Sequence, residues 1–234
     1  MEFGLDGAVV LVTGGVRGVG LGITRAFLAA GATVLTCSRR PPEPDVAEHD
    51  LAGHGLTERD LAGHISCDIR DPEQVAGLID RVVADHGRLD VLVNNAGGAP
   101  PAQAALASPR FHAKVVELNL LAPLLVSQLA NLQMQRQPGG GAIVMVSSVS
   151  AARPSPGTAA YGAAKAGLNN ITASLAVEWA PKVRVNALGV GMVRTEQSEL
   201  HYGDAAGVAA VGRTVPLGRL AEPDEIGACA VFLA

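Results

Sequence analysis

The feature that most constrains the fold of this chain is a short apolar run that leads directly into a glycine-rich turn. Residues 8–12 read Ala-Val-Val-Leu-Val, which is typical of a strand buried on both faces. The turn spans Thr13 to Gly20, and residues 21–30 then have helical periodicity that stops at Gly31. Glycines let the backbone approach a pyrophosphate, whose charge then faces free N–H groups at the positive end of the helix. The stretch therefore predicts a nucleotide-binding loop.

Apolar runs and helical segments alternate along the rest of the chain. Further strands are predicted at residues 32–37, 65–67, 89–93, 141–146 and 183–188, and helices at 72–86, 111–135 and 161–179. This alternation predicts an α/β fold with a doubly wound parallel sheet and helices on both faces. Hydrophobic residues make up 48% of the 234 residues, which is ample for one core, and no linker divides the chain. We expect residues 1–234 to form a single domain.

Charge and cysteine usage exclude several classes of protein. The formal net charge is -4 without a basic stripe, so we expect no nucleic-acid or anionic-membrane partner. Cys37, Cys67 and Cys229 cannot all pair and lack CxxC spacing, which argues against a disulfide framework or zinc site. The N-terminus does not read as a secretory signal, and residues 115–134 contain too many polar groups for a membrane span. These features predict a cytoplasmic protein.

A five-residue repeat stands in the least regular part of the chain. Asp50-Leu51-Ala52-Gly53-His54 recurs as Asp60-Leu61-Ala62-Gly63-His64. Carboxylate and imidazole groups could suggest a metal site. The second copy leads into a predicted strand and the first does not, so the copies should differ in conformation. We interpret the repeat as a local duplication in a tolerant segment and predict no metal.

The end of the second predicted strand bears on the choice of cofactor. It reads Ser38-Arg39-Arg40, in a place where dinucleotide folds use a carboxylate for the ribose 2'-hydroxyl or an arginine for a 2'-phosphate. No carboxylate is present, and Arg17 of the glycine-rich turn adds another guanidinium, which binds phosphate well. Solvated loop arginines are the alternative. We favour the phosphate site and predict NADP(H) rather than NAD(H).

Tyr161 and Lys165 lie four residues apart at the start of a predicted helix and so share one face. A nearby ammonium favours a phenolate, so Tyr161 could exchange a proton near neutral pH. For an isolated pair, a core tyrosine beside a surface lysine is the simpler alternative. The choice between these readings depends on the rest of the chain.

Further motifs give the chain a strong resemblance to the short-chain dehydrogenase/reductase family, in its single-domain branch with a Tyr-x-x-x-Lys motif. The matching residues are Thr13-Gly14-x-x-x-Gly18-x-Gly20, Asp68, Asn94-Asn95-Ala96-Gly97, Asn119, Ser148, Tyr161-x-x-x-Lys165, Arg184-Val185-Asn186-Ala187 and Gly218-Arg219-x-x-x-Pro223. Several are weak alone, but their joint order and spacing make coincidence very improbable. The resemblance implies a Rossmann-like fold and an oxidoreductase that transfers a hydride between NADP(H) and a carbonyl or alcohol.

The resemblance implies a catalytic set of Asn119, Ser148, Tyr161 and Lys165. Tyr161 would be the general acid in carbonyl reduction and the base in alcohol oxidation. Lys165 would lower the pKa of Tyr161 and hold the nicotinamide ribose, and Ser148 would bind the substrate oxygen. Asn119 would hold a water that links Lys165 to solvent. A helix cap at Ser148 and a backbone-satisfied amide at Asn119 are the alternatives, but neither explains why all four residues occur together.

The resemblance also implies a cofactor-binding set spread along the chain. Its members are Gly14, Arg17, Gly18 and Val19 at the phosphates, Ser38, Arg39 and Arg40 at the 2'-phosphate end, Asp68 and Ile69 at the adenine, Asn95, Ala96 and Gly97 beside the adenosine ribose, and Tyr161, Lys165, Val193 and Thr195 at the nicotinamide end. Asn94 is expected to tie strands together rather than to touch the cofactor.

Three departures from the family pattern stand out. Val190-Gly191 replaces the usual Pro-Gly, which should leave the backbone beside the nicotinamide less restrained. Ala164 stands where serine is common, and we expect this change to be harmless. Relatives continue beyond the position of Ala234 into a seventh strand, so we expect the sheet of this chain to lack its last strand.

The substrate pocket is expected between residues 97–103, 150–157 and 196–213, with the last segment as a mobile lid. No basic cluster or aromatic cage identifies a substrate there. The resemblance implies a homodimer or homotetramer that uses the long helix near Asn119 and the helix after Tyr161. A catalytically silent nucleotide-binding regulator and an NAD(H)-preferring dehydrogenase remain alternatives, although a regulator has no need of an acidic Tyr161.

Overall fold

A single parallel sheet forms the centre of the protein. The computed structural model describes residues 4–41 and 61–234. Its strands are β1 (Val9–Thr13), β2 (Thr33–Ser38), β3 (Leu61–Ser66), β4 (Val91–Asn94), β5 (Gly141–Ser148) and β6 (Val183–Val190). They form a 6-stranded sheet in the order β3-β2-β1-β4-β5-β6, with every pair parallel. The order changes direction between β1 and β4, and in such sheets ligands bind at the carboxyl ends of the strands near that point.

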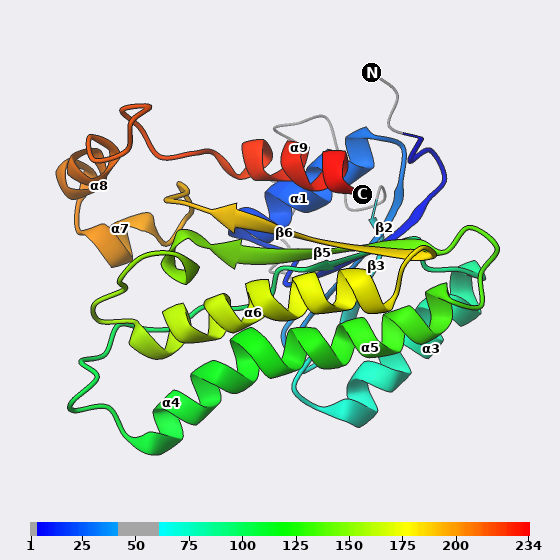
Figure 1. Ribbon diagram of the computed structural model, residues 1–234. Coiled ribbons are helices and arrows are strands. Elements are labelled where there is room, and N and C mark those ends of the chain that lie inside the picture. The colour runs from blue at the N-terminus through cyan, green and yellow to red at the C-terminus, as the bar shows by residue number, and fades with distance from the viewer. Residues whose placement is uncertain (1–3, 42–60) are drawn as a thin grey trace.

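Helices cover both faces of the sheet, as predicted. One face carries α1 (Gly18–Ala29) and α9 (Pro223–Leu233), and the other carries α3 (Pro72–His86), α4 (Pro109–Val116), α5 (Ala122–Met134) and α6 (Ala159–Glu178) (Figure 1). This arrangement is the Rossmann-like doubly wound fold in one domain.

The alternating side chains of the strands supply two apolar cores. Val10 and Val12 of β1 pack with Ile23 and Phe27 of α1 on one face. Leu11 packs into the second core with residues of α5 and α6 on the other face. The central strands are thus buried on both sides, which explains why their sequences are apolar throughout.

The predicted long helix at 111–135 is interrupted by a π-helical turn, Glu117–Leu121, between α4 and α5. Within the described ranges, the run from Pro109 to Met134 is the helix that is long and apolar enough to cross a membrane by length and composition. It packs against α3 and α6 and contributes to the core below the sheet. Its apolar character is therefore that of a core helix.

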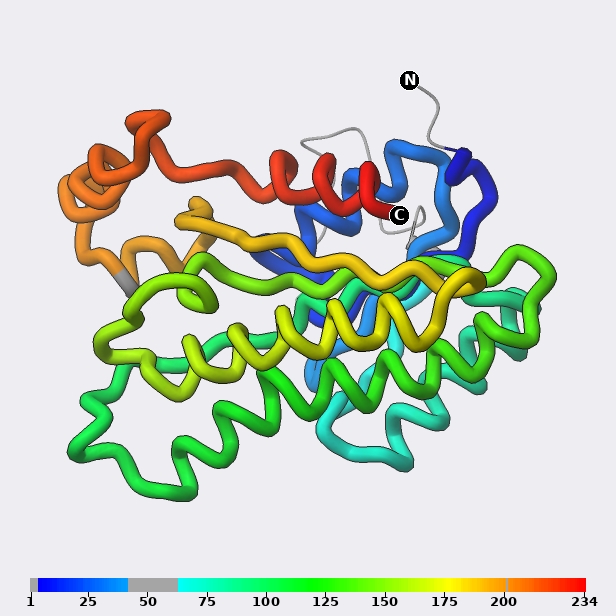
Figure 2. Tube along the Cα trace, viewed as in Figure 1, coloured from blue at the N-terminus to red at the C-terminus, as the bar shows by residue number. Residues whose placement is uncertain are grey.

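The loops after the strands gather at one end of the molecule. Figure 2 shows the chain around residues 95–108, 149–158 and 191–213 at the left end of the tube, where β5 and β6 end. Two short helices, α7 (Ser198–Tyr202) and α8 (Ala205–Gly212), lie at this end and occupy the segment predicted as a lid.

Candidate active site and cofactor cleft

The glycine-rich turn after β1 is packed against the segment after β4. Gly14 and Gly18 have φ angles of 65° and 50°, which favour glycine. A Cβ atom on Gly14 would lie 3.1 Å from both Ala96 Cα and Asn95 Nδ2. Asn95 Nδ2 in turn donates hydrogen bonds to the carbonyl oxygens of Thr13 (2.9 Å) and Gly14 (3.0 Å). The two segments predicted to contact the cofactor therefore hold each other in place.

The first turn of α1 is open to an anionic group. Arg17 is the N-cap residue, and no side chain caps the helix and no acidic residue stands in its first turn. The N–H groups at this end carry the positive pole of the helix, to which a phosphate binds well. The Arg17 side chain is exposed and Val19 is half-buried beside it. These residues fit the diphosphate of a nicotinamide dinucleotide.

The carboxyl ends of β2 and β3 place Ser38, Arg39 and Arg40 near Asp68. Arg39 and Arg40 are exposed, and Arg39 is close enough to lower the pKa of Asp68. The larger cause of that lowered pKa is Arg70, which binds both Asp68 oxygens at 2.9 and 2.5 Å. The predicted adenine contact at Asp68 is thus already engaged in an ion pair.

Asn119, on the π-helical turn, is fully buried and its amide bonds only to backbone. Its Nδ2 donates to the carbonyl oxygens of Gly98 and Val115, both at 2.9 Å, and its Oδ1 accepts from the Gly98 N–H at 2.8 Å. The backbone thus satisfies the Asn119 amide, which is the alternative given above for this residue. The same contacts bring Asn119 to the site, because a Cβ atom on Gly97 would lie 2.7 Å from Asn119 Oδ1 and 3.5 Å from Lys165 Nζ.

Ser148, Tyr161 and Lys165 meet where β5 ends and α6 begins. The Ser148 hydroxyl lies close enough to Tyr161 to act on its pKa. The Ser148 Oγ accepts the Ser150 N–H at 3.1 Å and caps the short helix Val149–Ala151, which is the helix cap named as the alternative for this residue. Lys165 Nζ lies 5.7 Å from the Tyr161 ring centroid and donates to the Val146 carbonyl oxygen at 2.7 Å.

The structure corrects the expected pKa of Tyr161. Burial raises the pKa of this phenol above its ordinary value of 10.0, and the nearby Ser148 hydroxyl opposes the rise only in part. Burial also lowers the pKa of Lys165 to about 8. Desolvation disfavours the charged form of each group, and here it outweighs the attraction on which the sequence argument relied.

The family model for enoyl-(acyl carrier protein) reductase, of the short-chain dehydrogenase/reductase type, matches residues 14–234. The chain belongs to the short-chain dehydrogenase/reductase family. It is similar to D-threitol dehydrogenase of Mycolicibacterium smegmatis, with 36% identity over 100% of this chain and 88% of that protein. As a short-chain dehydrogenase/reductase it is an oxidoreductase that uses a nicotinamide cofactor.

Solved structures of short-chain dehydrogenases/reductases match the whole fold. Ligand-free aldohexose dehydrogenase of Thermoplasma acidophilum has a TM-score of 0.88 at 28% identity and covers 100% of this chain and 89% of that one. A single-residue variant of actinorhodin polyketide ketoreductase with NADPH has a TM-score of 0.87 at 28% identity and covers 97% and 90% of the two chains. The six-stranded sheet is therefore that of the family.

The segment after β6 in this short-chain dehydrogenase/reductase returns to the glycine-rich turn. A Cβ atom on Gly18 would lie 3.3 Å from Thr195 Cγ2. Val193 is fixed by a parallel bridge to Ala221. Val190, which replaces the usual proline, is the last residue of β6 and pairs with Ser148. The backbone here is thus held by strand pairing as far as residue 190.

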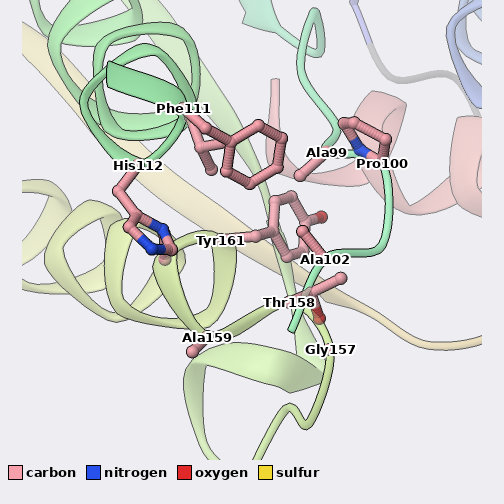
Figure 3. Close-up of a pocket in the computed structure, with 11 residues that line it drawn as sticks. Ala99, Pro100, Ala102, Phe111, His112, Gly157, Thr158, Ala159 and Tyr161 are labelled. Carbon is pink, nitrogen blue, oxygen red and sulfur yellow. The ribbon is translucent and has the colours of Figure 1, made fainter. Parts of the chain in front are cut away.

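A small pocket beside Tyr161 includes residues that the sequence did not indicate. Its lining includes Ala99, Pro100 and Ala102 from the predicted pocket segment, together with Phe111 and His112 of α4. Figure 3 shows the Phe111 and Tyr161 rings in this pocket, with Ala99 and Pro100 to the right of the rings and His112 to their left. Helical periodicity could not reveal this contact, since it gives a helix face but not the neighbour of that face.

Two further polar residues near the strand ends differ in role. Asn94 Nδ2 donates to Met145 Sδ of the neighbouring strand β5 at 3.3 Å, as expected, and also to Ser127 Oγ of helix α5 at 2.8 Å. His64, treated in the sequence only as part of a repeat, bonds to side chains of β2, at Thr36 Oγ1 (3.1 Å) and Ser38 Oγ (3.4 Å). The rest of the repeat with possible metal ligands, Asp50, His54 and Asp60, lies outside the described residues.

Proposed function

We propose that this protein is an NADP(H)-dependent carbonyl reductase or alcohol dehydrogenase in which Tyr161 is the general acid and base. The observation that carries the proposal is the position of the Ser148 hydroxyl beside Tyr161, close enough to act on the Tyr161 pKa, with Lys165 one turn along the same helix. A bound nicotinamide ring would supply or accept the hydride. The residues of this chain would supply the proton, the position of the substrate oxygen and the exclusion of water.

Tyr161 is suited to donate a proton to a carbonyl oxygen. Its raised pKa keeps the phenol protonated at neutral pH, which is the form that reduction requires. Ser148, which lies beside Tyr161, would donate a hydrogen bond to the same substrate oxygen as negative charge develops there. Lys165, which is buried near Gly97, would bind the nicotinamide ribose. Its ammonium would return to Tyr161 the proton that the phenol gives to the substrate.

The preference for NADP(H) rests on the basic residues at the end of β2. Arg39 and Arg40 are exposed there, and no described carboxylate stands in the sequence between Cys37 and Pro41 to bind a 2'-hydroxyl. Arg17 stands at the N-terminus of α1. Guanidinium groups in these positions favour a doubly charged 2'-phosphate.

The lid, the assembly and the location are also proposals. Residues 196–213, which include α7 and α8, would close over a small alcohol or carbonyl substrate. A homodimer or homotetramer through the π-helical turn, α5 and α6 is supported by exposed apolar side chains on these elements, namely Leu121, Leu132 and Val177. We place the protein in the cytoplasm.

Substitution of Tyr161 by Phe tests the mechanism. Turnover of a ketone and alcohol panel, followed by nicotinamide absorbance, should fall by at least about 100-fold, because proton transfer is lost. The dissociation constant for NADPH should stay nearly unchanged, since the aromatic ring remains. An equal loss of turnover and NADPH affinity would refute the assigned role, and a wild-type protein that binds NADPH but turns over no substrate would favour the silent regulator.

A further inference from the structure

His64 forms a polar chain with two side chains of the neighbouring strand. In the pairing of β2 with β3, His64 lies opposite Thr36, and Ser38 follows two residues later on the same face of the sheet. The imidazole Nδ1 is 3.1 Å from Thr36 Oγ1, and Nε2 is 3.4 Å from Ser38 Oγ. His64 is half-buried and Thr36 is fully buried. These contacts fix the His64 side chain at the proposed 2'-phosphate end of the cofactor cleft.

The hydrogen bonds determine the tautomer of His64. Ser38 Oγ donates its single proton to the Arg40 carbonyl oxygen at 2.5 Å. The contact with His64 therefore requires Nε2 to carry the proton and donate to Ser38. Nδ1 is then an acceptor, and Thr36 donates to it. A neutral imidazole agrees with the burial that lowers the pKa of His64, a shift that the Ser38 backbone opposes only in part.

The chain of bonds continues into the segment that carries the arginines. Thr36 fixes His64, His64 orients Ser38, and Ser38 holds the Arg40 carbonyl. This last bond closes the turn Ser38-Arg39-Arg40, so it limits the directions in which both arginine side chains can leave the backbone. The Asp68 carboxylate nearby is bound by Arg70 and not by Arg39.

We propose that His64 is a positioning residue for cofactor choice, which orients Ser38 and thereby the Arg39–Arg40 turn toward the 2'-phosphate of NADP(H). The inference rests on the proposed NADP(H) function and adds a residue to it. His64 need not touch the cofactor, because it acts through the Ser38 hydroxyl. Its loss should weaken NADPH binding and leave NADH binding nearly unchanged, since NADH has no 2'-phosphate.

The test compares dissociation constants of NADPH and NADH for the purified protein by fluorescence titration, which needs no substrate. For His64→Leu we expect the preference for NADPH over NADH to fall about fivefold, the effect of one ordinary hydrogen bond. His64→Gln places an amide N–H near the former Nε2 and should retain most of the preference. His64→Asn reaches only toward Thr36 and should lose it. The Gln and Asn variants also replace His64→Leu if that variant fails to fold.

Three comparisons separate positioning from a general structural effect. In a Ser38→Ala background, His64→Leu should cause no additional loss, because both act through the same hydroxyl. His86→Leu, at the far end of α3, is a control that should leave both dissociation constants unchanged. Arg39→Asp gives the preference for NADPH over NADH that remains when one guanidinium is lost, and it serves as the reference for the size of the His64 effect.

The outcomes distinguish this inference from the proposed function. A wild-type protein that binds NADPH no better than NADH overturns both. A wild-type preference for NADPH that persists in His64→Leu, or that is lost equally in His64→Gln and His64→Asn, overturns the role of His64 alone. An equal weakening of NADPH and NADH binding in His64→Leu also overturns it, because that result indicates a general structural effect.

Discussion

Burial of the Lys165 ammonium should make the stability of this protein depend on pH in a way that one substitution removes. The Lys165 side chain is 3% exposed, and burial lowers its pKa from 10.5 to about 8. Between these two pH values the unfolded chain keeps the proton that the folded chain has released. Because the unfolded state then binds more protons, the free energy of unfolding rises as the pH rises. The full interval corresponds to about 3 kcal/mol.

Lys165→Met tests this reasoning, since methionine fills similar space without a charge. Urea denaturation followed by circular dichroism at pH 7.5 to 10.5, a range set by the cited pKa values of about 8 and 10.5, gives the free energy of unfolding of both proteins. The wild-type value should gain on the variant by up to about 3 kcal/mol across that range. Parallel pH profiles for the two proteins would show that Lys165 is not desolvated, and the reasoning would then be wrong.

Two further predictions concern packing and assembly. Gly22→Ala should lower the free energy of unfolding by about 1–3 kcal/mol in urea denaturation, because its Cβ atom would lie 2.3 Å from the backbone of Pro223, where α1 meets α9. Gly77→Ala is the matched control and should raise the free energy of unfolding by about 0.5–1 kcal/mol, since the space around Gly77 in α3 is open. A loss of stability in both variants would contradict the contact at Gly22. Static light scattering should find a dimer or tetramer for the wild-type protein, and Leu121→Asp should lower the measured particle mass. A wild-type monomer would contradict the proposed assembly.

The sequence predicted most strands and the helices α1, α3 and α6 because their signals are local, whereas the strand predicted at 65–67 spans Leu61–Ser66 and helix α9 was not predicted. The buried strands are apolar runs, and α3 begins at Pro72 and ends before Gly87 as its capping residues indicate. The interruption of the long helix was not predictable in the same way. The Asn119 side chain bonds to Val115 within the helix and to Gly98 in a distant loop, and no periodicity records the second contact.

The site illustrates the same difference between local and tertiary information. Ser148 stands at the end of β5, and Tyr161 and Lys165 stand in the first turns of α6, so a strand end and a helix start bring the three residues of the motifs to one place. The direction of the Tyr161 pKa depends on how far its surroundings exclude water, which the sequence does not report. The contacts of His64 could not be predicted, because they arise only from the register between β2 and β3.

The double hydrogen bond between Asn119 and the Gly98 backbone has a consequence for protein engineering. Residue 98 donates to and accepts from the same amide, so the start of the loop between β4 and α4 is fastened to the π-helical turn. A loop transplanted from a relative to change substrate range must reproduce this backbone path at its first residues. Grafts that begin after residue 98 keep the anchor, whereas grafts that begin before it must carry a compatible partner for position 119.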